Sequence, residues 1–331
     1  MTLLRERELE DLWNAHIQAH ERRGIGPWGR AVSSHRFRSA IETTFSGSRL
    51  QGCLDSDRSS IAIVDALDEK VLLGLFRDHS VSAIHVKRFC SPEIAHRLSA
   101  VARREHAQWK LKGTIGTDMH YAGGSIPIEV ATHSKPDFFR YFAEWHTFVD
   151  RQRAASIGAW PIDRLRLTLD DVWQHGARLG DFAGRKARPA MMRIMTPDNA
   201  DAPNQGFIHV DGGTYPDPKH GNASANIYLE MPPSGGELQV WNVDVGSQQG
   251  PVQIMRSYYV RALLDKAFDV LSQKRLSACL PPPLTIRPEV GDLVIFHTGR
   301  PHAVRPARGG FRVTNQTFLE YTEKKPLVIW S

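Results

Sequence analysis

The spacing of hydrophobic positions divides the chain into two parts that meet near residue 190. In the first part apolar residues recur every three or four positions, which is typical of helices that bury one face. One stretch, 81–89, instead alternates polar and apolar residues and predicts a strand. The sequence predicts helices at about 4–23, about 136–155 and about 169–179, and a further helix that begins at residue 91.

Capping residues support two of these helices. Ser91-Pro92-Glu93 combines a serine N-cap, a proline in the first helical position and an acid in the first turn. Thr168-Leu169-Asp170-Asp171 offers a capping hydroxyl for the range 169–179. We therefore expect both helices to begin at these sequences.

After residue 190 the chain consists of short β-type runs. Turn sequences separate them, such as 232–236 with two prolines and two glycines. One helix, about 256–276, interrupts the series. Many short strands in one half predict a sandwich or jelly roll with the helices packed outside one sheet. The predicted strands are 191–195, 206–210, 226–231, 237–241, 284–287, 292–296, 311–321 and 327–330.

The length of the chain allows one large domain with additions, or two domains. It has 331 residues, of which 41% are hydrophobic. We divide it at the strand 81–89. Residues 1–80 are predicted to form an N-terminal helical extension, and residues 81–331 the β domain with its packed helices.

Charge and cysteine content narrow the class of protein. The net charge of +6 is spread along the chain, without a basic run or an aromatic–basic stripe, which argues against a nucleic-acid partner. It fits a mildly basic surface and weakly favours an anionic small-molecule substrate. The three cysteines, Cys53, Cys90 and Cys279, are far apart, so neither a disulfide framework nor a thiolate zinc site is indicated.

The N-terminal sequence and the lengths of the apolar runs bear on localisation. The first residues are charged from the fifth position, unlike a signal peptide. Apolar runs stay short of the ~18 residues that a membrane span needs. We expect a cytoplasmic protein with no membrane partner, and leave its oligomeric state open.

Two histidines and one aspartate in the β half are candidate metal ligands. His209 and Asp211 are two positions apart, so in a strand both side chains point to the same side. His302 would reach them from a distant strand, as a barrel or sandwich allows. Two imidazoles and one carboxylate occupy one face of Fe(II) and leave the opposite face open. We predict that His209, Asp211 and His302 bind iron and form the catalytic centre.

An arginine and a threonine farther along suit a 2-oxo acid. Such an acid chelates iron through its keto oxygen and adjacent carboxylate, and its far carboxylate needs a cation. Arg312 lies on the strand predicted after His302, and Thr314 points to the same side. Arg193 lies in the apolar run 191–195, where it either faces the interior and meets a carboxylate or faces outward at a sheet edge.

Each assignment has a simpler alternative. His209 and Asp211 would share only a loop hydrogen bond, and Arg312 would form a surface ion pair. His297, at the end of the strand 292–296, competes with His302 for the third ligand position. We favour His302 because it stands 10 rather than 15 residues before Arg312. His297 then lies behind the metal ligands or on the substrate side.

Several motifs of the C-terminal half resemble those of the Fe(II)/2-oxoglutarate-dependent oxygenases. The likeness covers roughly residues 80–331. It is nearer to the subgroup that contains the iron-dependent halogenases of indole alkaloids and the hydroxylases of N-acyl amino acids. It implies an α+β fold with a mainly β core, a double-stranded β-helix (jelly roll, cupin-like) with flanking helices. The motifs are Gly235-Gly236-Glu237-Leu238, Gly291-Asp292-Leu293, Gly299-Arg300-Pro301-His302 and Ile329-Trp330-Ser331.

The resemblance also implies an activity. Its cofactors are Fe(II), 2-oxoglutarate and O2, with ascorbate in a supporting role. The reaction is hydroxylation of an unactivated aliphatic carbon of a small molecule, with decarboxylation of 2-oxoglutarate to succinate. In the halogenases a small residue replaces the carboxylate ligand and opens a site for chloride. Asp211 fills that position here, so a hydroxylase or another oxidative enzyme is expected.

The sequence leaves the substrate open among amino acid derivatives, nucleotides and specialised metabolites. Two other classes of function compete with the oxygenase. One is a cupin-like metal-dependent isomerase or dioxygenase that does not use 2-oxoglutarate. The other is a non-catalytic barrel that binds a metabolite.

Overall fold

The computed structural model describes residues 59–106, 120–121, 135–182, 184–197, 206–211, 220–243 and 270–331. The predicted helix 4–23 lies outside these ranges, as does most of the predicted helix 256–276.

Two facing β-sheets form the centre of the molecule. In the larger sheet five strands lie side by side, and each pairs antiparallel with its neighbour. In order across the sheet they are β2 (Val81–Val86), β11 (Leu293–His297), β8 (His220–Glu230), β13 (Arg312–Thr322) and β7 (Met191–Met195).

The smaller sheet is also antiparallel. It consists of β10 (Leu284–Ile286), β9 (Leu238–Val240) and β12 (His302–Val304). An isolated bridge between His209 and His302 extends it on the far side of β12. The segment before Asp211 therefore acts as its outermost strand.

The path of the chain between the sheets is that of a jelly roll. From β7 the chain crosses to the His209 segment in the smaller sheet and returns as β8. It then forms β9 and β10 in the smaller sheet, β11 in the larger, β12 in the smaller and β13 in the larger. This alternation defines a double-stranded β-helix. The predicted fold class, α+β with a mainly β core, is confirmed.

Further strands extend the larger sheet. β1 (Ser60–Val64) pairs parallel with β2, β14 (Leu327–Trp330) pairs with β13, and β4 (Ala177–Leu179) pairs with β14. β3 (His120–Tyr121) pairs with β7. A separate hairpin is formed by β5 (Asp181–Phe182) and β6 (Arg185–Lys186). Residues 60–80, which the sequence assigned to an N-terminal extension, thus contribute a strand and the helix α4 (Glu69–Phe76).

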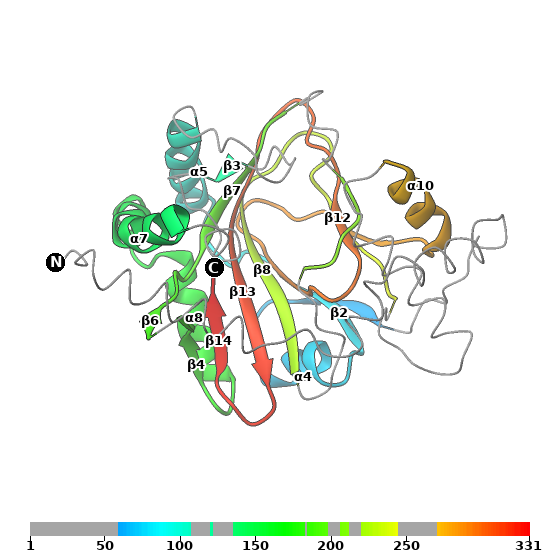
Figure 1. Ribbon diagram of the computed structural model, residues 1–331, viewed down its shortest axis with the longest axis horizontal. Helices are drawn as coiled ribbons and strands as arrows, with labels where there is room; N and C mark the ends of the chain where they lie inside the picture. The colour runs from blue at the N-terminus through cyan, green and yellow to red at the C-terminus, as the bar shows by residue number, and fades with distance from the viewer. Residues whose placement is uncertain are drawn as a thin grey trace.

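Helices cover the outer face of the larger sheet. Figure 1 shows α5 (Pro92–His106), α7 (Lys135–Ala155) and α8 (Pro161–Val172) on one side of β7 and β13, with β12 on the other side. Apolar side chains from these helices meet those of the sheet in one buried cluster, in which Leu98 and Leu165 pack with Val313. Burying one such side chain contributes roughly 1.5–3 kcal/mol. A smaller cluster, which includes Tyr228, fills the space between the sheets.

The structure confirms most of the predicted elements and corrects one. The strand 81–89, the helix that begins at Pro92 and the helix near 136–155 are present as β2, α5 and α7. The predicted helix 169–179 is wrong. α8 has already begun at Pro161, and the chain is extended by Trp173.

Proline explains where α8 begins, and an aspartate explains the turn after it. Pro161 lies in the first turn of α8, where its missing N–H is no loss. Asp170 accepts the backbone N–H of Ala177 at 2.7 Å, so it stabilises the turn into β4 rather than the start of a helix. Gly176 in this turn has a φ of +71°, which suits glycine.

The helices in the described ranges are too short or too polar to cross a lipid bilayer.

Candidate metal centre

The backbone places two of the predicted ligands directly opposite each other. His209 donates its N–H to the carbonyl oxygen of His302 at 2.9 Å, and His302 donates to that of His209 at 2.8 Å. Residues that exchange both hydrogen bonds in an antiparallel pair project their side chains from the same face. The N–H of Asp211 donates to the carbonyl oxygen of Thr298 at 3.0 Å, which ties the third ligand to the same edge.

The side chains of His209, Asp211 and His302 converge. One nitrogen or oxygen atom from each lies within 4.8 Å of the others. Asp211 Oδ1 is 3.6 Å from His209 Nε2, and Asp211 Oδ2 is 3.5 Å from His302 Nε2. A metal ion bound at about 2 Å from each donor fits between atoms at these separations. The structure therefore brings together the three residues predicted as a triad.

Backbone carbonyls orient both imidazoles. His209 Nδ1 lies 3.2 Å from the carbonyl oxygen of Phe207, and His302 Nδ1 lies 2.9 Å from that of Arg300. A carbonyl oxygen only accepts, so each Nδ1 carries the hydrogen and donates it. Each Nε2 is then left with a lone pair that points toward Asp211. Hydrogen bonds of this kind fix the tautomer of metal-binding histidines.

Burial and mutual charge set the protonation states. Burial, followed by the neighbouring charge of His302, lowers the pKa of His209 to about 4. Burial alone would raise the pKa of Asp211, but the neighbouring His302 and His209, with the charge of Arg193, hold it below its usual range. At neutral pH the site therefore offers a neutral His209 imidazole and an ionised carboxylate, which are the forms that bind metal.

Two aromatic rings flank the imidazoles. The Phe207 ring lies 4.4 Å from that of His209, and the Phe296 ring lies 4.8 Å from that of His302 in an edge-on arrangement, both measured between centroids. These contacts limit rotation of the ligands. The His302 side chain is only 3% exposed, while that of Asp211 is 26% exposed, so the site opens on the Asp211 side.

His297, the competing candidate, lies elsewhere. It ends β11 in the larger sheet, where its Nδ1 accepts the backbone N–H of Gly299 at 3.1 Å. Its ring meets that of His79 edge-on, at 5.5 Å between centroids. Burial, with the charges of His79 and Arg300, lowers its pKa to about 3. The structure thus places His302, and not His297, beside Asp211.

The three remaining predicted site residues face the interior between the sheets. Val313 packs against the helices, so Arg312 and Thr314 on either side of it project the opposite way. Arg193 lies opposite Thr314 on β7, next to Met192, which faces the helices. The charge of Arg193 adds to the lowering of the pKa of both His209 and Asp211.

Arg312 is a buried cation that forms no ion pair with an acid among the residues that the structure describes. Its side chain is 4% exposed. Nε donates to the carbonyl oxygen of Gly236 at 3.2 Å, Nη2 donates to the hydroxyl of Tyr228 at 3.3 Å, and the guanidinium lies 5.0 Å from the centroid of the Tyr228 ring. These partners, like Met195, are uncharged. A guanidinium buried this way needs an anion to offset its lost hydration.

Two glycines shape the turn that contacts Arg312. Gly235 and Gly236 both have a φ of +76°. A Cβ on Gly235 would lie 1.8 Å from the carbonyl oxygen of Pro306. The Gly-Gly motif is therefore required by the close approach of this turn to the segment before β13, and it presents the carbonyl oxygen of Gly236 to Arg312.

Sequence reasoning missed Tyr228. The sequence places it with Asn226 on one face of a strand that could line a pocket, but that pattern favours core or sheet packing over a binding site. The register of β8 against β13 places Tyr228 opposite Thr314. The hydroxyl of Thr314 is fully buried and has no hydrogen-bond partner among the residues that the structure describes. Arg312, Tyr228 and Thr314 thus form one polar group.

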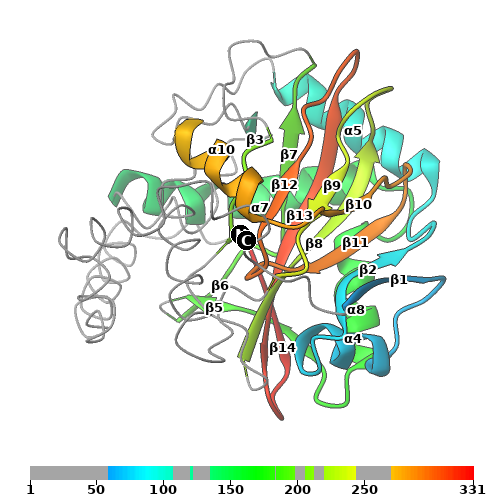
Figure 2. The same ribbon diagram turned by 90° about the vertical axis from the view of Figure 1, so that its right-hand side faces the viewer.

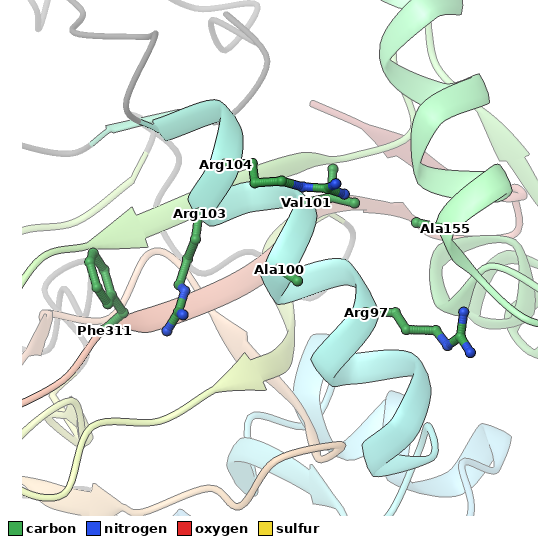
Figure 3. Close-up of a pocket in the computed structure, with 7 residues that line it drawn as sticks. All are labelled: Arg97, Ala100, Val101, Arg103, Arg104, Ala155 and Phe311. Atoms are coloured by element: carbon green, nitrogen blue, oxygen red, sulfur yellow. The ribbon is translucent and has the colours of Figure 1, made fainter.

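A shallow pocket on the helical side is separate from this group. Its volume is about 750 Å³, and it is lined on α5 by Arg97, Arg103 and Arg104, among others (Figure 3). Phe311 also lines the pocket, and Arg103 Cζ lies 5.4 Å from the centroid of its ring. Because α5 covers the outer face of the larger sheet, the sheet divides this pocket from His209 and His302.

Comparison with known proteins gives one relative by sequence. No family model matches the chain. An L-gamma-glutamyl-L-propargylglycine hydroxylase from Streptantibioticus cattleyicolor is 27% identical over 204 residues. The match covers 56% of this chain and 66% of the hydroxylase, so it spans just under two thirds of that relative.

The chain resembles the Fe(II)/2-oxoglutarate-dependent oxygenases. That resemblance, predicted from the motifs, agrees with the hydroxylase relative. An N-substituted L-amino acid dioxygenase from Burkholderia ambifaria is 13% identical, with a TM-score of 0.42 over 77% of this chain and 88% of its own. HygX from Streptomyces hygroscopicus, solved with nickel and 2-oxoglutarate, is 12% identical, with a TM-score of 0.40 over 78% and 88%.

Proposed function

We propose that this protein is an Fe(II)- and 2-oxoglutarate-dependent oxygenase that hydroxylates an aliphatic carbon of a small molecule. The observation that carries the proposal is the combination of two sites on one jelly roll. His209, Asp211 and His302 converge within 4.8 Å, and the guanidinium of Arg312, which has no ion-pair partner among the described residues, is buried between the same two sheets. A metal site alone would fit many proteins, whereas the buried cation calls for an anionic ligand.

The donor set fits Fe(II). Two imidazole nitrogens and one carboxylate are the ligands of non-haem iron oxygenases, and they leave coordination positions for other molecules. The Nδ1 hydrogen bonds of His209 and His302 hold both rings with Nε2 toward Asp211. We propose that these three residues hold the iron.

The second polar group fits the far carboxylate of 2-oxoglutarate. A planar guanidinium binds a carboxylate through two parallel hydrogen bonds, and a hydroxyl adds a third. Arg312 supplies the guanidinium, and Thr314 supplies a buried hydroxyl that has no partner within the described part of the chain. Tyr228 orients Arg312 through its hydroxyl and ring. Arg193, opposite Thr314 and near Asp211, suits a second carboxylate, that of the cosubstrate or of the substrate.

Bound Fe(II) and 2-oxoglutarate supply oxidative decarboxylation to succinate and CO2, with transfer of an oxygen atom from O2 to a C–H bond. The protein contributes binding, orientation and exclusion of water. Asp211 holds its carboxylate between the two imidazoles, in the position that a halide would otherwise take. We therefore propose hydroxylation rather than chlorination.

We propose a carboxylate-bearing amino acid derivative as the substrate. The curated relative is named for a hydroxylation of a glutamyl dipeptide. Arg193, which faces the interior opposite Thr314, would receive a carboxylate, and the net charge of +6 does not oppose an anion. Nucleotides and specialised metabolites without a carboxylate are the competing substrates.

The experiment is a metabolite screen for succinate formation. The purified protein is incubated with Fe(II), ascorbate and 2-oxoglutarate, and candidate compounds are added one by one. Stimulation of succinate release by amino acid derivatives, with a product heavier by one oxygen atom, supports the proposal. Absence of 2-oxoglutarate turnover with every compound, in a protein shown to bind Fe(II), would contradict it.

A further inference from the structure

The segment that carries His209 has a second partner besides β12. In an extended segment, backbone groups of successive residues point to opposite edges. The N–H and carbonyl of His209 point to β12 and pair with His302. Those of Ile208 point to the other edge, where the smaller sheet has no further strand within the described residues.

A glutamine side chain fills this edge. The N–H of Ile208 donates to Gln273 Oε1 at 2.7 Å, and Gln273 Nε2 donates to the carbonyl oxygen of Ile208 at 2.9 Å. A primary amide has one donor and one acceptor side, so it reproduces the two hydrogen bonds that a neighbouring strand would make. Ile208 itself is 4% exposed, and leaving its backbone groups unpaired there would be costly.

Gln273 comes from a helix that is remote in sequence. It lies on α10 (Val270–Cys279), which precedes β10 in the connection from β9. In Figure 1 α10 lies on the side of the smaller sheet, away from α5, α7 and α8, and in Figure 2 this side faces the viewer with α10 in front. Leu276 and Cys279 are its buried apolar positions, while Lys274 is exposed.

We propose that Gln273 is a positioning residue for the metal ligands. By pairing with both backbone groups of Ile208 it fixes the segment from the side opposite His302, so His209 and Asp211 are held between β12 and α10. The inference rests on the proposed function for the identity of the metal site. It adds that the position of α10 is coupled to the geometry of that site.

The coupling between α10 and the metal ligands follows from the short distance along the chain between Ile208 and those ligands. Ile208 precedes His209 directly and Asp211 by three residues, with Asp211 anchored to Thr298 on the β12 side. Loss of the amide pair would free one edge of this segment while the other edge stays paired. Hydrogen-bonded groups that orient metal ligands typically change metal affinity by about 10–100-fold when they are removed.

The test compares Gln273→Met, which keeps the length of the side chain but makes no amide pair, with Lys274→Met on the exposed side of α10. Co(II) serves as an air-stable probe, and its visible absorption reports affinity and ligand geometry without turnover. We expect Gln273→Met to weaken Co(II) binding by about tenfold or more and to alter the spectrum. Lys274→Met should match the native protein in both.

Hydrogen–deuterium exchange of the metal-free proteins gives a second readout. The amides of residues 206–211 should exchange faster in Gln273→Met, while those of β8 stay protected. Should Gln273→Met fail to fold, Gln273→Glu decides, because it retains the acceptor for Ile208 and loses the donor. If the folded variant matches the native protein in Co(II) affinity, Co(II) spectrum and amide exchange, the inference is overturned. Failure of the native protein to bind metal would instead overturn the proposed function.

Discussion

His209 and His302 exchange two backbone hydrogen bonds, at 2.8 and 2.9 Å, across the edge of the smaller sheet. This pair brings their rings to 4.3 Å between centroids and leaves each Nε2 facing Asp211. Ligands far apart in the sequence are therefore set by sheet register rather than by loop conformation. A site held in this way is prepared before a metal arrives.

Substituting the two candidate histidines one at a time distinguishes the metal ligand from the histidine that lies elsewhere. His302→Ala should lower the affinity for Fe(II) or Mn(II) by about 100-fold or more, because one of three donors is lost. His297→Gln should bind metal as the native protein does, since His297 lies with His79 on the larger sheet. Calorimetric titration under anaerobic conditions measures both. Equal losses in the two variants would mean that His302 has been misassigned.

Removal of the buried cation should affect the cosubstrate and not the metal. In Arg312→Met the two charge-assisted hydrogen bonds to a carboxylate disappear, each worth about 1.5–3 kcal/mol. The Kd for 2-oxoglutarate should rise by at least about 100-fold, while Mn(II) affinity stays within about twofold.

Tyr228→Phe provides the graded control for Arg312. It removes one neutral hydrogen bond of 3.3 Å to Arg312 and keeps the ring beneath the guanidinium. A net contribution of about 1 kcal/mol predicts a rise of about fivefold in the Kd for 2-oxoglutarate. Unchanged 2-oxoglutarate binding in Arg312→Met would exclude the cosubstrate site as described.

Chloride tests the role of Asp211. The native protein, assayed with its substrate in chloride buffer and in chloride-free buffer, should form the same hydroxylated product in both. The carboxylate lies 3.5 and 3.6 Å from the two imidazole nitrogens, where it would act as the third metal ligand in place of a halide. Mass spectrometry distinguishes the products, and a chlorinated product from the native protein would refute this assignment.

His297 should make the folded protein sensitive to acid. Burial lowers its pKa to about 3, against an ordinary value of 6.5, so the unfolded chain takes up a proton that the folded chain does not. The contribution of His297 to the free energy of unfolding is therefore complete above pH 6.5. It falls as the pH drops toward 3, by up to about 1.4 kcal/mol per pH unit.

Denaturant unfolding at several pH values measures the contribution of His297. The native protein should lose stability more steeply between pH 6.5 and 4 than His297→Gln, which carries no titrating group at this position. His79 and Arg300 remain in both proteins, so the difference in slope belongs to His297. Parallel pH profiles would show that the buried imidazole does not titrate as described.

Patterns along single strands predicted much of the site. The two-residue spacing of His209 and Asp211, and of Arg312 and Thr314, fixes which side chains share a face, and the structure agrees for both pairs. The helix predicted over 169–179 failed because Pro161 starts α8 a turn or more earlier, and the aspartate read as a cap serves the following turn.

Contacts between elements were beyond the sequence. Tyr228 meets Arg312 through the register of β8 against β13, and Gln273 meets Ile208 through the packing of α10. Neither relation leaves a periodic signal, because each depends on how distant segments are aligned. Buried polar groups of this kind become visible only when the strands are placed side by side.

The most direct test of the central claim is anaerobic absorption spectroscopy with Fe(II) and 2-oxoglutarate. An iron chelated by a 2-oxo acid absorbs visible light through charge transfer from metal to ligand, and no substrate is required. We predict that the native protein develops this band only when both components are added, and that His302→Ala and Arg312→Met develop it weakly at the same concentrations. Absence of the band in the folded native protein, or its full development in His302→Ala, would contradict the account.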